Sequence, residues 1–192
     1  MITRWEPENL RGDGALIRVA LPADVPGIAR VHVDAWRSTY RGIVPGTALA
    51  ARSYAEHERK WKQRVHASPG AYRILVAADR GQGVVGFAHG GPRRAGPVAY
   101  AGELYAIYIL EAHQRRGLGR RLVLTMAQWL VERGVVSMLV WVFAGNPAHR
   151  FYETLGARRV DAKRVAIGGA DLEEVAYGWA DLDALVRAER GT

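Results

Sequence analysis

The stretch that decides the fold is Gln114–Gly119, with the sequence QRRGLG. The apolar run 103–110 before it predicts a β-strand. After it, apolar residues recur at spacings of three and four over 118–130, which predicts an amphipathic helix that stops at Gly134. The nearly unbroken apolar run 135–143 then indicates a strand buried on both faces. The predicted unit is therefore strand, glycine-rich turn, helix, strand.

The turn has the features of an anion-binding site. The first N–H groups of a helix have no partner within it, and the helix dipole places partial positive charge there. Gly117 and Gly119 lack the Cβ atoms that would keep a bulky anion away. The turn is neither a dinucleotide fingerprint, because it lacks the third glycine, nor a P-loop, because no Gly-Lys-Ser/Thr follows. The alternative to an anion-binding site is a basic turn that binds no ligand. Four arginines add permanent charge: Arg115, Arg116, Arg120 and Arg121.

The same six residues match the Q/R-x-x-G-x-G/A signature of the GCN5-related N-acetyltransferase superfamily, whose members bind the pyrophosphate of acetyl-CoA there. Tyr108–Leu110 stands where the family has its Tyr-Val-x strand end. The segment 146–157, NPAHRFYETLGA, resembles the family's N-x-x-A-x-x-F-Y-E-x-x-G-F. It departs in the spacing of its first Ala and in Ala157, where the family has Phe, and Ala112-His113 stands where Pro is common. None of these changes removes a group that the chemistry needs.

The resemblance implies an α/β (α+β) fold with one mixed, mostly antiparallel sheet of about seven strands and helices on both faces. In this family two parallel strands splay apart at their ends, and the pantetheine arm of the cofactor enters the gap. The strand–helix–strand unit is expected to be a right-handed crossover. A chain of this length holds one core but not two, so we expect a loose arm at residues 1–13 and a single domain over residues 14–192.

Patterning predicts the remaining elements. The helix expected at 47–66 has only a thin apolar stripe, so we expect it to pack loosely and act as a lid. The loop 90–97, which carries Arg93 and Arg94, is expected to be a solvated connection, with contact to the acceptor as the alternative. Further strands are expected at 15–20, 72–78, 84–90, 164–167 and 173–179, and further helices at 22–40, 147–155 and 181–188.

Acetyl transfer from a thioester to an amine needs a neutral amine, a polarised carbonyl and a proton for the leaving thiolate. The resemblance implies that Glu103 is the general base, directly or through water, and that Tyr152 is the general acid. Alternation along a strand predicts that Glu103 shares a face with Tyr105 and Ile107. The alternatives are a solvent-exposed Glu and a Tyr that only packs on the pantetheine.

The cofactor implied by the resemblance is acetyl-CoA. A β-bulge in the strand before the turn is expected to free the N–H groups of Ile109 and Leu110 for the thioester carbonyl and the pantetheine amides. Asn146 is expected to bond the pantetheine arm, and its alternative role is to cap the following helix. The expected cofactor-binding set is Tyr108, Ile109, Leu110, Gln114, Arg115, Arg116, Gly117, Leu118, Gly119, Arg120, Asn146 and Tyr152.

The acceptor pocket of this family lies beside the first helix and the loop that follows it. An aromatic pocket with one acid suits a small amine or an amino-acid-like molecule; a peptide amine stays open, as do acyl groups other than acetyl. A core position is the alternative for Trp36, and His89 and His113 receive no catalytic role. The expected substrate-binding residues are Trp36, Tyr40, Trp61 and Tyr105, with Arg41 as a further candidate.

The whole chain has 192 residues, a net charge of +8 and no Cys, so acyl transfer is expected to be direct. Its basic residues are scattered outside the turn, so we expect no nucleic-acid partner. No apolar run approaches the roughly 20 residues of a membrane span, and no ligand spacing suggests a metal. We therefore expect a metal-free cytoplasmic enzyme. A homodimer stays open, and a non-catalytic acyl-CoA-binding or regulatory domain is the alternative function.

Overall fold

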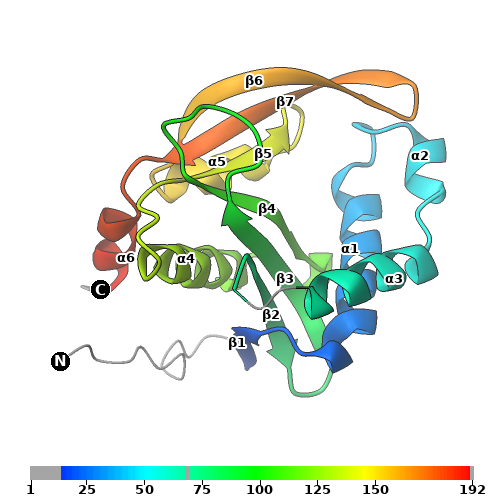
Figure 1. Ribbon diagram of the computed structural model, residues 1–192. Coiled ribbons are helices and arrows are strands. Elements are labelled where there is room, and N and C mark those ends of the chain that lie inside the picture. The colour runs from blue at the N-terminus through cyan, green and yellow to red at the C-terminus, as the bar shows by residue number, and fades with distance from the viewer. Residues whose placement is uncertain (1–13, 68–69, 191–192) are drawn as a thin grey trace.

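The computed structural model describes residues 14–67 and 70–190 (Figure 1). The predicted arm at residues 1–13 lies outside them. One seven-stranded sheet runs through the molecule, with helices on both faces. Its strands are β1 (Ala15–Val19), β2 (Arg73–Asp79), β3 (Gly83–Pro92), β4 (Gly102–Ile109), β5 (Met138–Phe143), β6 (Arg158–Ile167) and β7 (Ala170–Trp179). The α-helices are α1 (Val25–Thr39), α2 (Gly46–Ala50), α3 (Tyr54–His66), α4 (Leu118–Val131), α5 (Ala148–Thr154) and α6 (Leu182–Arg190), with 3₁₀ turns η2 (Pro22–Asp24) and η3 (Glu111–His113).

The strand order is β1-β2-β3-β4-β5-β7-β6. All neighbours are antiparallel except β4 and β5, which are parallel and are joined through α4. The β6–β7 hairpin turns at Gly168 and Gly169, whose φ angles of 57° and 82° suit a two-residue hairpin turn. This mixed, mostly antiparallel sheet confirms the predicted fold class.

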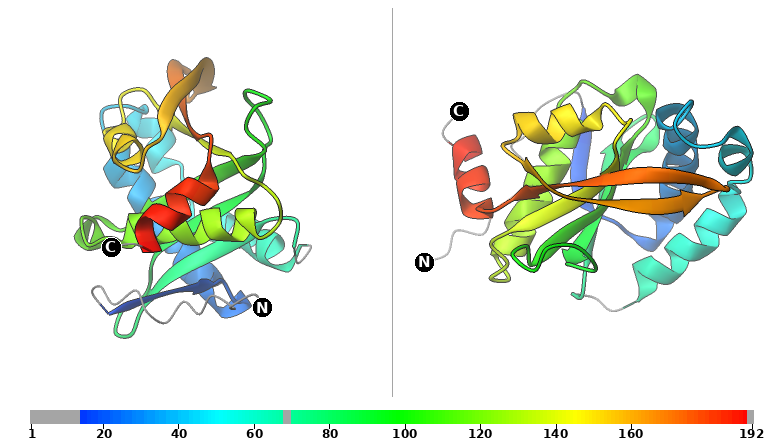
Figure 2. Two further views of the ribbon diagram at one scale, coloured as in Figure 1. Left: turned by 90° about the vertical axis from the view of Figure 1, so that its left-hand side faces the viewer. Right: turned by 90° about the horizontal axis from the view of Figure 1, so that it is seen from above.

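Two apolar layers cover the faces of the sheet. The helices α4 and α6 pack on one face, where Leu122 and Met126 are buried. The helices α1 and α3 pack on the other face, where Ile28 is buried. The β6–β7 hairpin reaches across to α2 (Figures 1 and 2). A Cβ atom on Gly168 would lie 2.6 Å from the Cβ of Ala48, so the hairpin turn touches α2. One end of the sheet is thereby enclosed between α1, α2 and the hairpin.

The parallel pair of strands opens after three residues. β4 pairs with β5 only over the segment from Gly102 to Leu104, although β4 continues to Ile109 and β5 to Phe143. Beyond Leu104, the side of β4 that faced β5 therefore has no strand to bond. This is the predicted splay, and it begins in the middle of the sheet.

Tyr105 forms a bulge in β4. The register of β4 against β3 shifts just after His89, which leaves Tyr105 without a partner on β3. The extra residue reverses the alternation of side chains, so that Tyr108 packs toward α1 and Ile107 packs toward α4. Strict alternation had put Ile107 on the face of Glu103 and Tyr105. That prediction is wrong because a bulge shifts the period by one residue.

The helix predicted at 47–66 is two helices, α2 and α3. Ser53 starts the second one, since its hydroxyl accepts a hydrogen bond from the N–H of Glu56 (3.4 Å). α3 is also firmly packed, because Trp61 is 1% exposed and donates its indole N–H to Nδ1 of His32 (3.1 Å). The prediction of a loose lid is therefore wrong. A single large aromatic side chain buries as much surface as several aliphatic ones.

Three further strands form where they are predicted but begin or end at other residues than predicted. β5 begins at Met138 instead of residue 135, because Gly134 takes a φ of 74° and the chain reverses there before the strand starts. β6 and β7 are longer than the predicted segments 164–167 and 173–179. Their added residues are mostly charged and partly exposed, so apolar patterning does not detect them.

We expect Trp61→Ala to lower the free energy of unfolding by about 3–5 kcal/mol, because it leaves a large cavity between α3 and the sheet. The exposed neighbour Lys62 gives the matched control, and Lys62→Ala should change stability by less than about 0.5 kcal/mol. Urea denaturation of both variants measures the two values. Equal, small losses would mean that α3 is loosely attached.

Candidate active site

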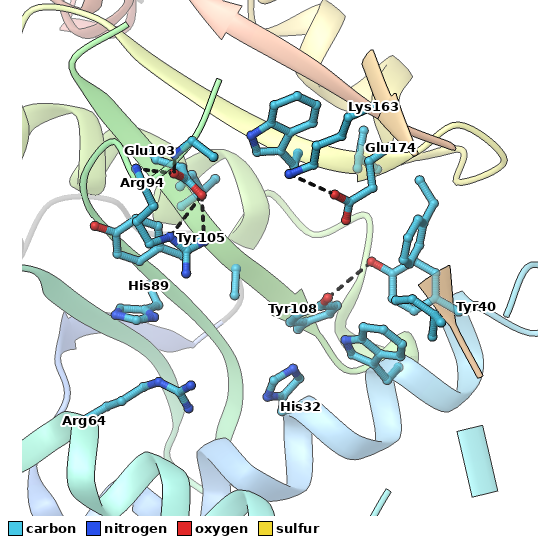
Figure 3. Close-up of a pocket in the computed structure, with 18 of the residues that line it drawn as sticks. His32, Tyr40, Arg64, His89, Arg94, Glu103, Tyr105, Tyr108, Lys163 and Glu174 are labelled. Carbon is cyan, nitrogen blue, oxygen red and sulfur yellow. Dashed lines mark hydrogen bonds and ion pairs between the residues drawn. The ribbon is translucent and has the colours of Figure 1, made fainter. Parts of the chain in front are cut away.

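A cavity of ≈ 510 Å³ lies over the gap between the diverging strands (Figure 3). β4 lines it with residues 103–106 and Tyr108, and β5 lines it with residues 141–143. The predicted substrate-binding residues Trp36, Tyr40, Trp61 and Tyr105 all line this cavity, and so does Glu103, whereas Arg41 is exposed and does not. Trp36 is both buried and part of the wall. The other lining residues are His32, Arg64, His89, Arg94, Ala95, Lys163, Ile167 and Glu174.

Glu103 is held by the loop that follows β3. The residue is 3% exposed, and both of its carboxylate oxygens accept hydrogen bonds. Oε2 accepts from the backbone N–H of Arg94 (2.7 Å) and of Ala95 (3.4 Å). Oε1 accepts from Nη2 (2.6 Å) and Nε (3.2 Å) of Arg94. The carboxylate is thus fixed in one orientation at the cavity wall.

Arg94 is a site residue that sequence reasoning placed in a solvated loop. Its guanidinium carbon lies 3.8 Å from the ring centre of Tyr105, in addition to the ion pair with Glu103. Arg94 is exposed, as expected for a connecting loop, but it also lines the cavity and pairs with Glu103. The loop folds back over the start of β4, and this contact cannot be predicted from a local sequence pattern.

Two neutral histidines stand opposite Glu103. The pKa values of His32 and His89 are lowered to about 3, chiefly because burial disfavours the charged imidazolium, and the charge of Arg64 acts in the same direction on both. His32 accepts from Trp61 at Nδ1, so its remaining proton is on Nε2. Nε2 of His89 is buried without a hydrogen-bond partner in the described part of the chain. Sequence reasoning gave neither residue a role.

Tyr40 and Tyr108 meet at the far end of the cavity. Their hydroxyl oxygens are 3.2 Å apart, and the Tyr108 ring stacks on His32 with centroids 5.1 Å apart. Burial raises the pKa of both phenols. The side chain of Tyr108, predicted to bind the cofactor, therefore belongs to the wall of the aromatic cavity.

Tyr152 lies outside the cavity wall, in the core formed by α4 and α5. It is 5% exposed, and its ring packs against Trp179 with centroids 5.9 Å apart. Burial raises the pKa of Tyr152 well above its ordinary value, and the nearby Tyr40 adds to the rise. The hydroxyl therefore keeps its proton at neutral pH. Asn146, two residues before α5, is buried, and its Oδ1 accepts a hydrogen bond from the N–H of Ala148, the first residue of that helix (2.9 Å).

The glycine-rich turn leads directly into α4. Gly117 takes a φ of 78° at the N-cap, and Arg115 takes a φ of 62°, a left-handed conformation that is uncommon for a residue with a side chain. A Cβ on Gly119 would lie 3.2 Å from Phe151 and 3.5 Å from Ile109. The backbone N–H groups of residues 116–119 bond to none of the described residues. This arrangement fits a diphosphate at the N-terminus of a helix of 14 residues.

The end of β4 offers fewer free donors than the sequence suggested. The N–H of Leu110 donates to the carbonyl of Val85 (3.0 Å), so the prediction that this group is free is wrong. Because hydrogen bonding alternates along an antiparallel strand, the N–H groups of Ile107 and Ile109 point away from β3, into the gap. The side chain of Gln114 donates to the carbonyl of Ile109 (3.1 Å) and ties the turn to the strand.

Comparison with known proteins decides the family. The protein named "Uncharacterized N-acetyltransferase YuaI" from Bacillus subtilis (strain 168) is 44% identical over 169 residues, which cover 88% of this chain and 95% of that protein. The chain belongs to the GCN5-related N-acetyltransferase superfamily. As a member it is an acyltransferase, in agreement with the predicted enzyme class. The family model described as "FR47-like protein" matches residues 95–166, which include the splayed strands and the glycine turn.

Solved structures agree on the N-acetyltransferase fold. The PaiA N-acetyltransferase from Thermoplasma acidophilum in complex with coenzyme A has a TM-score of 0.68 at 18% identity, covering 85% of this chain and 98% of that chain. The yncA protein from Salmonella typhimurium, a putative acetyltransferase solved with its cofactor acetyl-CoA, has a TM-score of 0.65 at 22% identity, covering 89% of this chain and 95% of that chain.

In the described part of this chain, no helix has the length and apolar character that crossing a membrane requires.

The buried, neutral His89 makes stability depend on pH. Its pKa of about 3 lies below the ordinary 6.5, so the unfolded chain binds the proton more readily and stability falls as pH drops below 6.5. Between about pH 7 and about pH 5 this one group accounts for a loss of about 2 kcal/mol. We therefore expect the free energy of unfolding of His89→Phe, measured by urea denaturation, to fall less than that of the wild type over this pH range, by about 2 kcal/mol. His66→Phe, at an exposed position of α3, should keep the full loss, and an unchanged loss in His89→Phe would contradict the assignment.

Proposed function

We propose that this N-acetyltransferase moves an acetyl group from acetyl-CoA to a primary amine by direct attack within a ternary complex. One observation carries the proposal. The cavity that holds Glu103 is lined by β4 and β5 in the region where these strands no longer pair. The gap therefore joins an acceptor cavity to a sheet edge with unbonded N–H groups, next to a glycine turn suited to a diphosphate. The coenzyme named in two structures of the same fold supports the choice of cofactor.

The turn and the end of β4 would hold the cofactor. The N–H groups of residues 116–119 would bond the diphosphate, with charge supplied by Arg115, Arg116 and Arg120. The N–H groups of Ile107 and Ile109, rather than that of Leu110, would bond the pantetheine arm and the thioester carbonyl. Acetyl-CoA, when bound, supplies the activated acetyl thioester.

Glu103 and Tyr152 would move the two protons. Glu103 would accept a proton from the acceptor ammonium, directly or through a water molecule, while the N–H groups of the loop between β3 and β4 hold its carboxylate in place. Tyr152 would donate its hydroxyl proton to the departing sulfur, since its raised pKa keeps it protonated until that moment. The second proton that the nitrogen loses as the amide forms would restore the tyrosine hydroxyl. The chain contains no Cys, so no cysteine thioester is formed and direct attack is the simplest route.

Binding of the cofactor can be tested without an acceptor. In titration calorimetry, coenzyme A should bind at least about 100-fold more tightly than pantetheine, because pantetheine lacks the diphosphate that pairs with the turn in charge-assisted hydrogen bonds. Equal affinities would mean that the diphosphate contributes nothing to binding. No binding of coenzyme A at all would refute the proposed function.

Tyr152→Phe tests the proton donor. We expect kcat to fall by about 100-fold or more, while the Kd for coenzyme A changes by less than about threefold, because only the proton is lost. Tyr177→Phe, in the same buried cluster, is the matched control and should keep kcat within about threefold of wild type. Equal kcat values for Tyr152→Phe and wild type would reject the acid role.

A further inference from the structure

The charged side chains in the cavity wall do not balance. Arg64, Arg94 and Lys163 are cations, and Glu103 and Glu174 are carboxylates. Glu103 is paired with Arg94 at 2.6 Å, and Glu174 is paired with Lys163 at 3.3 Å. His32 and His89 are neutral because their pKa values are about 3. One cation in the wall, Arg64, therefore has no counter-charge.

Arg64 is placed to receive an anion. It projects from α3 at the mouth of the cavity, and its guanidinium carbon lies 5.1 Å from the ring centre of Trp61. The guanidinium forms neither a hydrogen bond nor an ion pair with any described residue. Figure 3 shows its guanidinium between His32 and His89, separate from the Glu103–Arg94 pair. Stacking on Trp61 restrains the side chain while its donors stay available.

His89 adds an unused polar group on the same side of the cavity. Its side chain sits among Trp61, Tyr72 and Tyr105, with ring centroids 4.8–5.5 Å away. It is 8% exposed, and Nε2 has no hydrogen-bond partner among the described residues. A buried polar atom without a partner is costly, and an unfilled ligand position accounts for it. In the tautomer with a proton on Nε2, the ring donates a hydrogen bond to an oxygen atom.

From this geometry we infer that the acceptor is a small amine that also carries a carboxylate, as a free amino acid does, with the carboxylate bound by Arg64 and His89 and the amine turned toward Glu103. This assignment rests on the proposed acetyl transfer and adds the substrate class. An amine arrives as an ammonium ion, and the excess charge of Arg64 opposes a molecule that is only cationic. A zwitterion brings an anion for Arg64 and an ammonium group for Glu103. Both requirements of the cavity are then met by one molecule.

The cavity volume agrees with a ligand of this size. A volume of ≈ 510 Å³ lies in the lower part of the range found for small-molecule sites. Its aromatic walls, which include Trp36, Trp61 and Tyr105, provide apolar contact for a side chain between the two charged ends. A peptide N-terminus would present its amine to Glu103 without a carboxylate at a fixed distance, so it would leave Arg64 unused.

The test compares each amino acid with its own α-carboxamide, which keeps the amine and lacks the carboxylate. L-amino acids and their α-carboxamides, together with dipeptide amides, are assayed for release of free coenzyme A from acetyl-CoA. For the preferred side chain, kcat/KM of the amino acid should exceed that of its amide by at least about 30-fold in the wild type. In Arg64→Gln the ratio should fall to within about threefold, and Arg64→Lys should keep part of it. Arg59→Gln, an exposed arginine on the same helix, should keep the full ratio.

A binding measurement separates this inference from the proposed function. Coenzyme A is titrated into the protein, and the same amino acids and amides are titrated into the protein both with and without coenzyme A. If coenzyme A fails to bind but amino acids bind in a manner that depends on Arg64, the carboxylate site stands and the proposed function falls. The inference is overturned, with the function intact, if amides or dipeptide amides match the amino acids, or if Arg64→Gln keeps the ratio. Failure of every carboxylate-bearing amine to bind or react also overturns it.

Discussion

The early divergence of β4 from β5 is the constraint on which the rest of the site depends. Two parallel strands that stop pairing in the middle of a sheet leave backbone donors without partners, and burial makes such groups costly. Here the strands part after Leu104, and the cavity forms over the place where they part. The helices α4 and α1 pack on opposite faces of the sheet and keep the gap from collapsing. The cavity and the unpaired edge of β4 are therefore direct results of the sheet geometry.

The bulge at Tyr105 completes this arrangement. It turns Tyr105, Ala106 and Tyr108 toward the cavity and leaves Ile107 in the core on the other side. One strand can thus supply an acid at its start, aromatic walls along its length and free N–H groups at its edge. A regular strand would place half of these residues on the wrong face.

Much of this could be predicted from the sequence, because the main signals are local. The apolar periods around residues 103–143 define the central unit, and the glycines of the turn mark the start of α4. The contacts that complete the cavity are not local. Arg94 reaches Glu103 only because a loop folds back, and Arg64 enters the wall only because Trp61 anchors a helix whose apolar stripe is thin. The resemblance predicted a bulge in this strand but not its position at Tyr105, and alternation predicts a face only while pairing stays regular.

Two of the charged residues at the cavity, both arginines, lie on exposed parts of the chain. Arg64 is an exposed residue near the end of α3, and the side chain of Arg94 is 59% exposed on a loop. The aromatic walls and the strands beneath them are buried in the core. Substitutions at these surface arginines can therefore change the charge of the cavity while the scaffold stays folded. Because the frame is buried and the charged rim is exposed, evolution can change the charges at the cavity without rebuilding the core.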